Sequence, residues 1–122
     1  MKITYTNEND YEFELETSYA TYADCYFDIA RYCDNSNTAI MITSKTEGQL
    51  LLATVNIDKL PFNCVAIKDY YENSGVAEAL MEAKVIEAEP YGYIPSGFVV
   101  VPIYRLTDRF ATYVHTKLDH CI

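Results

Sequence analysis

Carboxylates are the most abundant groups with chemical potential in this sequence, and their spacing favours binding. Glu12, Glu14 and Glu16 alternate with apolar residues, so they share one face of a predicted strand, with neighbours about 6.6 Å apart. Asp24 and Asp28 follow at a four-residue spacing. Such carboxylates can pair with arginine and lysine side chains of a partner. Alternatively, they form an ordinary solvated strand face.

A second acidic segment extends over residues 69–89, where six acidic residues accompany a single lysine. Tyrosines flank this segment, and aromatic residues with a polar tip are frequent both in interfaces and at ordinary half-buried positions. Its candidate partner-binding residues are Glu72, Glu78, Glu82, Tyr70 and Tyr71.

Residue types needed for other chemistry lack the required spacing. With four glycines in all, the chain contains no glycine-rich phosphate loop. His115 and His120 lie in the last eight residues with no Gly-x-Ser-x-Gly before them, which disfavours nucleophilic hydrolysis, and both are expected to be solvent-exposed. The four cysteines show no Cys-x-x-Cys spacing and are expected to be reduced, mostly buried thiols. We therefore predict no enzymatic activity, no metal site and no cofactor.

Charge defines the kind of partner. Eighteen acidic and nine basic residues give a formal charge of −9, which repels nucleic acids and anionic membranes and attracts basic protein surfaces. The chain contains no apolar run of about 18 residues, and its first residues do not resemble a signal peptide. These features predict a cytoplasmic protein that does not bind nucleic acid directly; they do not predict its oligomeric state.

The element that organises the predicted fold is the apolar, β-branched run 97–106. It reads as a strand inside a sheet, although Pro102 requires an edge in its second half or a bulge. Residues 89–96 are expected to form a connector or a functional loop. Further strands are predicted at residues 3–5, 11–16, 38–43, 49–56 and 64–68. Helices are predicted at residues 18–33, capped by Thr17 or Ser18, and near residues 75–86, capped by Ser74 or Asn73. A short last helix, capped by Thr107 or Asp108, is predicted to end near Leu118, because Phe110, Val114 and Leu118 have four-residue spacing. Residues 1–122 thus predict a single α+β domain, with a mainly antiparallel sheet of about five to six strands packed with two or three helices.

Three segments resemble a known family. They are residues 53–57, residues 65–75 with the Lys-Asp-Tyr-x-Glu-Asn-x-Gly segment at 68–75, and the Ser-Gly-Phe-Val-x-Val-Pro segment at 96–102 with its continuation to 106. Together they resemble small uncharacterised proteins encoded on plasmids, integrative elements and phages of Gram-positive bacteria. Accessory genes on such elements often encode inhibitors of host defence, so the resemblance implies anti-restriction or anti-CRISPR activity. It implies no catalytic residues.

These observations lead to two hypotheses of different classes. In the first, the protein is a non-enzymatic inhibitor whose carboxylates occupy the basic nucleic-acid groove of a defence nuclease, most plausibly a type II RNA-guided CRISPR effector, and block guide RNA or DNA binding. In the second, it is an accessory or regulatory module of a plasmid or phage that binds another protein through its tyrosines. An enzyme acting on a small substrate is a third reading, which a pocket with a strongly shifted carboxylate would support.

Overall fold

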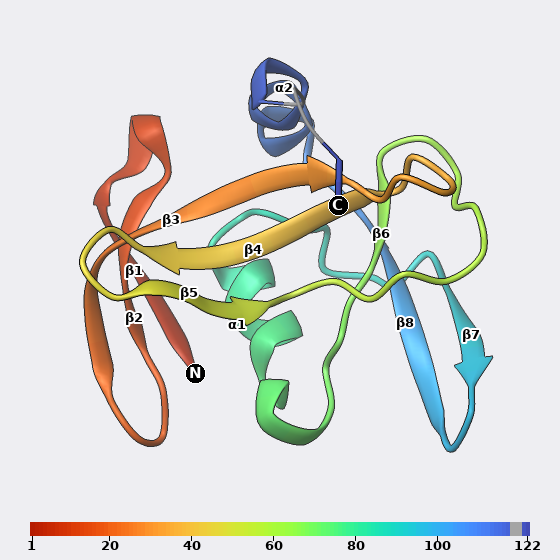
Figure 1. Ribbon diagram of the computed structural model, residues 1–122, viewed down its shortest axis with the longest axis horizontal. Helices are drawn as coiled ribbons and strands as arrows, with labels where there is room; N and C mark the ends of the chain where they lie inside the picture. The colour runs from red at the N-terminus through yellow and green to blue at the C-terminus, as the bar shows by residue number, and fades with distance from the viewer. Residues whose placement is uncertain (118–120) are drawn as a thin grey trace.

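A computed structural model, which describes residues 1–117 and 121–122, contains two antiparallel sheets and two α-helices (Figure 1). The first sheet has five strands in the order β1-β2-β3-β4-β5, and the second has three in the order β6-β8-β7. The elements are β1 (Lys2–Asn7), η1 (Glu8–Asp10), β2 (Glu12–Glu16), β3 (Thr21–Arg31), β4 (Thr38–Ser44), β5 (Gly48–Leu52), β6 (Cys64–Ala66), η2 (Tyr71–Asn73), α1 (Val76–Glu82), β7 (Gly92–Ser96), β8 (Val99–Arg105) and α2 (Asp108–Lys117). The predicted single α+β domain, composed mainly of sheet, is confirmed.

The predicted helix over residues 18–33 is wrong, because β3 occupies most of that segment. Cys25, Phe27 and Ile29 point to the core from alternate positions of β3, and aromatic and β-branched residues such as Phe27 and Ile29 favour strands. The supposed cap, Thr17, instead stabilises the β2–β3 turn: its hydroxyl accepts the N–H groups of Tyr19 and Ala20. A local turn signal was therefore mistaken for the start of a helix.

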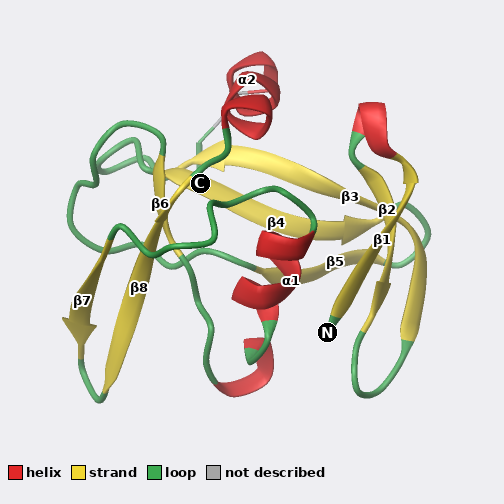
Figure 2. Ribbon diagram, turned by 180° about the vertical axis from the view of Figure 1, so that it is seen from behind, coloured by secondary structure: helices red, strands yellow, loops and turns green. Residues whose placement is uncertain are grey.

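The main core lies on the inner face of the first sheet, which α1 and α2 cover (Figures 1 and 2). Phe13, Phe27 and Phe110 are essentially inaccessible to solvent, and the Phe27 and Phe110 rings meet edge to face with centroids 5.2 Å apart. Buried aromatic pairs of this kind combine a large apolar area with a favourable orientation of their quadrupoles. This aromatic cluster joins the sheet to the helix α2.

Strand β8 is the central strand of the second sheet, and Pro102 lies within it. On the β6 side, β8 pairs only through residues 103–105, and Ile67 donates its N–H to the Pro102 carbonyl at 3.0 Å. Proline has no N–H to return, so regular pairing with β6 ends there. The first half of β8, which pairs with β7 but not with β6, is therefore the part that has an open edge. The prediction of an edge in the second half is wrong.

The segment predicted as an irregular connector, residues 89–96, contains the edge strand β7. Strands β7 and β8 form a hairpin that extends from the body of the molecule (Figure 1). Tyr93, Phe98 and Val100 are exposed on this hairpin, and Phe98, at its tip, is as accessible as in an extended chain. Prolines concealed this strand, since Pro95 is tolerated only because β7 is an edge strand.

Both shorter helices are found where they were predicted, with differences in their ends. Helix α1 ends at Glu82, earlier than expected, and neither Asn73 nor Ser74 caps it; the Asp69 carboxylate accepts the Gly75 and Ala77 N–H groups instead. In α2, the predicted cap Thr107 is confirmed, since its hydroxyl accepts the Phe110 N–H at 3.3 Å. Leu118 and His120 lie outside the described residues.

The cysteines divide into two pairs. Cys25 and Cys64 are buried free thiols, as predicted. Cys33 and Cys121, however, form a disulfide across 88 residues of sequence, so the expectation of four reduced thiols is wrong. The bond attaches Cys121 to the segment just after β3, and Ile122 also donates its N–H to the carbonyl of Arg31, the last residue of β3, at 2.8 Å. No sequence spacing announces a disulfide between residues so far apart.

Candidate functional site

Three of the predicted partner-binding carboxylates form one exposed group on the first sheet. Glu14 and Glu16 point outward from β2, while Phe13 and Leu15, which alternate with them, are fully buried. An extra residue in β3 places Asp24 in a bulge opposite Glu14, where Asp24 adopts a left-handed conformation with φ of 55°. We call Glu14, Glu16 and Asp24 the acidic strand group. All three lie within the β2–β3 pair, and none forms an ion pair with any residue that the structure describes.

Two other predicted residues of this region, Glu12 and Asp28, have different surroundings. Glu12 is partly buried and forms an ion pair with Lys45. Asp28 is partly buried and lines a hollow beside α2 together with Tyr113 and Lys117. A helix had been expected to place Asp24 and Asp28 on one face four residues apart; β3 instead puts one in a bulge and the other on the regular strand. The structure therefore brings Asp24 toward Glu14 and not toward Asp28.

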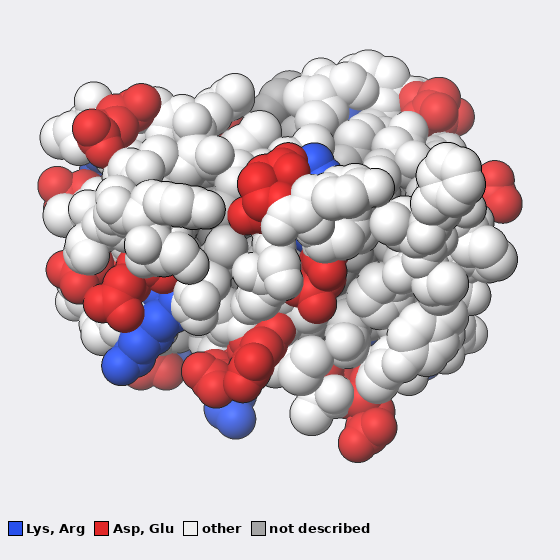
Figure 3. All heavy atoms as spheres, turned by 90° about the horizontal axis from the view of Figure 1, so that it is seen from below, with Lys and Arg blue, Asp and Glu red and all other residues white. Residues whose placement is uncertain are grey.

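The second predicted acidic segment does not extend the acidic strand group. Glu78 and Glu82 are exposed on α1. Glu72 forms an ion pair with Lys68 at 2.8 Å, and the hydrogen bond from Lys68 lowers the pKa of the Glu72 carboxyl. Seen from below, acidic side chains occur in several separate groups with uncharged surface between them (Figure 3). The predicted carboxylates thus come from two separate sets of elements, β2 with β3 and η2 with α1.

The two predicted tyrosines have unequal exposure. Tyr71 is 72% exposed, whereas Tyr70 is partly buried and packs against the smaller core cluster beside β6 and β8. Their rings meet edge to face with centroids 5.2 Å apart. Tyr71 is therefore available to a partner, while Tyr70 mainly supports it.

A buried thiol lies directly beneath the acidic strand group. Burial is the main cause that raises the pKa of the Cys25 thiol. A hydrogen bond with the Leu15 backbone lowers this pKa, and the charges of Asp24 and Glu14 raise it by smaller amounts. A thiol with a raised pKa remains protonated at neutral pH and is a poor nucleophile. Cys25 is therefore a packing residue of the core.

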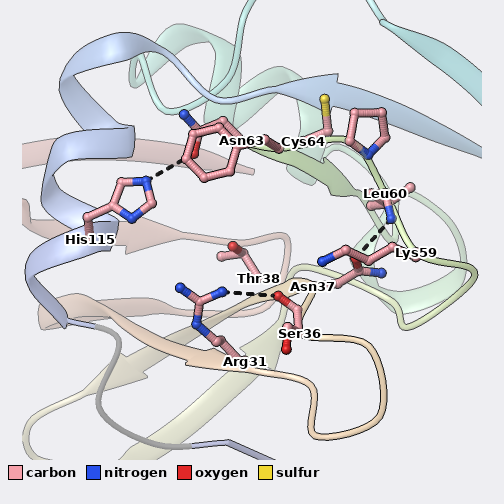
Figure 4. A pocket seen from close by; sticks show the side chains of 11 residues that line it. Arg31, Ser36, Asn37, Thr38, Lys59, Leu60, Asn63, Cys64 and His115 are labelled. Carbon is pink, nitrogen blue, oxygen red and sulfur yellow. Dashed lines mark hydrogen bonds between the residues drawn. The ribbon is translucent and has the colours of Figure 1, made fainter.

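A cationic pocket that sequence reasoning missed lies where β3 ends and β4 begins (Figure 4). Arg31 comes from β3, Lys59 and Asn63 from the loop before β6, and His115 from α2. His115 was expected to be an exposed structural residue; it is exposed, but it also hydrogen bonds to the Asn63 side chain at 3.2 Å. Four separate segments build this pocket, and no local motif in the sequence connects them.

Comparisons of the chain with protein-family models, curated proteins and solved structures found no match. None of the helices in the described part of the chain has the length and apolarity to cross a membrane. Within residues 1–117 and 121–122, histidine, cysteine and acidic side chains form no group of three or more suited to a metal ion. The features that remain for a functional argument are the acidic strand group, the cationic pocket and the apolar hairpin.

Proposed function

We propose that this protein is a non-enzymatic inhibitor that binds the basic nucleic-acid groove of another protein. The observation that carries this proposal is the acidic strand group, in which three exposed carboxylates form no ion pair with a described residue. Lys45, which pairs with Glu12, also interacts electrostatically with Asp24. Asp24 lies in the β3 bulge that faces Glu14 between the Phe13–Cys25 and Leu15–Tyr22 pairs, and like charges on neighbouring strands repel. Arginine or lysine side chains of a partner would relieve that repulsion through charge-assisted hydrogen bonds.

The class of target follows from charge and from the family resemblance. The formal charge of −9 disfavours direct binding to DNA or RNA and favours a basic surface, such as the groove that holds a guide–target duplex. Resemblance to proteins of plasmids, integrative elements and phages supports a host defence nuclease as the owner of that groove. A type II RNA-guided CRISPR effector is the first target to test, and competition with guide RNA or DNA is the proposed mode of inhibition.

Charge reversal at matched positions tests both the binding and the surface used. One variant carries Glu14→Lys and Glu16→Lys, and its control carries Glu78→Lys and Glu82→Lys. Both pairs are exposed carboxylates, and both variants change the net charge by the same amount. Binding to the purified effector, with and without guide RNA, is measured together with target cleavage, and circular dichroism confirms that each variant is folded.

The proposal expects the wild type to bind the effector and inhibit cleavage, with an association rate that falls as salt screens the charges. The strand variant loses most of this association, whereas the α1 control retains most of it. Equal loss in both variants would assign binding to net charge rather than to the acidic strand group. Undiminished cleavage with several type II effectors would refute inhibition of this nuclease class.

A second candidate function, an accessory protein-binding module, is favoured by the exposed aromatic residues. Tyr71 is 72% exposed, Tyr91 is 54% exposed and Phe98 is completely exposed, and aromatic side chains of this kind are enriched in interfaces. Binding of this type would change little with salt. It would weaken on Tyr71→Ala or Tyr91→Ala and persist in the Glu14→Lys, Glu16→Lys variant, which is the opposite of the result expected for the inhibitor.

A further inference from the structure

The cationic pocket is a defined cavity of about 200 Å³. Its walls are the end of β3, the turn into β4, the loop before β6 and one side of α2. Drug-sized ligands occupy pockets of about 300–1,000 Å³, so this cavity suits something smaller. The lining residues are Arg31, Ser36, Asn37, Thr38, Lys59, Leu60, Pro61, Phe62, Asn63, Cys64 and His115.

The pocket is lined by basic residues, whereas the whole chain carries a net negative charge. The chain has twice as many acidic as basic residues, yet none of the described residues that line the pocket is acidic. Two of the nine Lys and Arg residues, Arg31 and Lys59, are there, together with His115. Because field lines concentrate in a recess lined by one sign of charge, the pocket is a local attractor for anions on an acidic molecule.

Hydrogen bonds hold the loop that forms one wall. The Asn37 side chain is buried; it accepts the Leu60 N–H at 3.0 Å and donates to the Asp58 carbonyl at 3.0 Å. Asn35 donates to the Ile57 carbonyl at 2.7 Å. These contacts attach the Asp58–Leu60 stretch to the turn that leads into β4. Lys59 therefore extends from a backbone held on both sides.

The opposite wall is held by contacts between α2 and the same loop. The Asn63 side chain hydrogen bonds to His115, and the Phe62 ring stacks on the His115 ring with centroids 5.4 Å apart. Figure 4 shows the Arg31 guanidinium, Thr38 and His115 facing the same hollow. Among the described residues, the Arg31 guanidinium makes one long hydrogen bond, to the Ser36 carbonyl at 3.4 Å. Since a guanidinium has five N–H donors, most of its donors remain available for a ligand.

We propose that this pocket binds a small oxyanion, namely a phosphate group, with Arg31 as its principal ligand. Arginine presents paired donors that match the oxygens of phosphate, and Lys59 and His115 add charge and a further donor. The Thr38 and Ser36 hydroxyls supply neutral donors at the same cavity. The phosphate is either the free ion or the terminal group of a small phosphomonoester. This site is separate from the acidic strand group and does not depend on the inhibitor function.

The test uses the full chain and amide NMR spectra during titration with inorganic phosphate, with sodium chloride as the ionic-strength match. Glycerol phosphate forms a second arm, because it binds only if the mouth of the pocket admits an esterified phosphate. Arg31→Gln removes the proposed principal ligand. Arg105→Gln removes an exposed arginine of β8 outside the pocket, so it controls for the change in net charge.

We expect saturable shifts at amides of the β3–β4 turn and the loop before β6. Arg31→Gln should weaken binding at least about tenfold, because a hydrogen bond to a charged group is lost, while Arg105→Gln leaves it unchanged. If Arg31→Gln does not fold, His115→Gln, at an exposed position of α2, gives the same comparison. Equal weakening in the pocket variant and in Arg105→Gln would overturn the proposal, as would shifts that chloride reproduces.

Discussion

Removal of the Cys33–Cys121 disulfide should destabilise the protein substantially. A cross-link limits the conformations of the unfolded chain, and the stabilisation grows with the length of the loop that it closes. For a separation of 88 residues, the chain-entropy relation gives about 4.6 kcal/mol, and native disulfides typically contribute about 2–4 kcal/mol. In a chain of this length, 1 kcal/mol changes the unfolding midpoint by about 4 °C. The expected fall is therefore roughly 8–18 °C.

The assay compares thermal unfolding of three forms: the oxidised wild type, the wild type with reductant, and the Cys33→Ser, Cys121→Ser double variant. Alkylation under denaturing conditions followed by mass spectrometry establishes the state of the thiols. Oxidised protein should take up label at the two free cysteines only, and reduced protein at all four. Both reduced protein and the double variant should unfold at the same lowered temperature.

Backbone hydrogen bonds beside the disulfide also hold the last residues in place, and they limit how much of the stability depends on the cross-link. Cys33 donates its N–H to the Ile122 carbonyl at 3.0 Å, beside the hydrogen bond from the Ile122 N–H to the Arg31 carbonyl. Backbone hydrogen bonds therefore hold Ile122 in addition to the disulfide at Cys121. If fully alkylated protein unfolds within about 2 °C of the oxidised form, the disulfide stabilises the fold by much less than the chain-entropy relation gives. Uptake of label at all four cysteines without reductant would show that the disulfide does not form.

Three further predictions concern the core, pH and a helix cap. The Tyr11 hydroxyl is buried without a hydrogen-bond partner among the described residues, whereas the Tyr5 hydroxyl donates to the Ala83 carbonyl at 2.6 Å. In urea unfolding, Tyr11→Phe should leave the free energy of unfolding unchanged or raise it, and Tyr5→Phe should lower it by about 1 kcal/mol. The reverse order would contradict this prediction. Burial raises the pKa of Tyr5 and Tyr11 above the usual 10.0, so the folded state holds these protons more tightly than the unfolded state. This contribution to stability is complete below about pH 10 and is lost as pH rises beyond it. The unfolding midpoint measured against pH should show this fall, and a flat profile would argue against buried phenols. Asp69→Ala leaves two α1 N–H groups without their acceptor and should cost about 1 kcal/mol, whereas an unchanged midpoint would show that water replaces the carboxylate.

Local patterns predicted those elements in which one periodicity dominates. The alternation of Phe13 and Leu15 with glutamates identified β2, and the four-residue spacing of Phe110 and Val114 identified α2. In both cases the buried residues are the ones whose spacing carried the prediction. The segment that became β3 instead supports both a helical and an alternating pattern, and pairing with β2 and β4 decided between them. Tertiary context of this kind is not present in a local window.

In the candidate sites, too, local patterns predicted some features, whereas others depend on tertiary packing. Glu14 and Glu16 were correctly placed on an outward strand face, because alternation alone determines that arrangement. The approach of Asp24 to Glu14 depends on a bulge in the β2–β3 pairing, which composition does not reveal. Arg31 and His115 are 84 positions apart in the sequence, and only the packing of α2 beside the end of β3 brings them to one pocket.

Proline in the edge strand has a consequence for how the hairpin can meet other molecules. Exposed sheet edges normally offer a row of N–H and C=O groups to which another strand can add, in aggregation as well as in recognition. Strand β7 is such an edge, but Pro95 has no N–H to give to an incoming strand. The hairpin therefore presents the side chains of Tyr93 and Phe98 while resisting strand addition. It can display apolar groups to solvent without also becoming a template for intermolecular sheets.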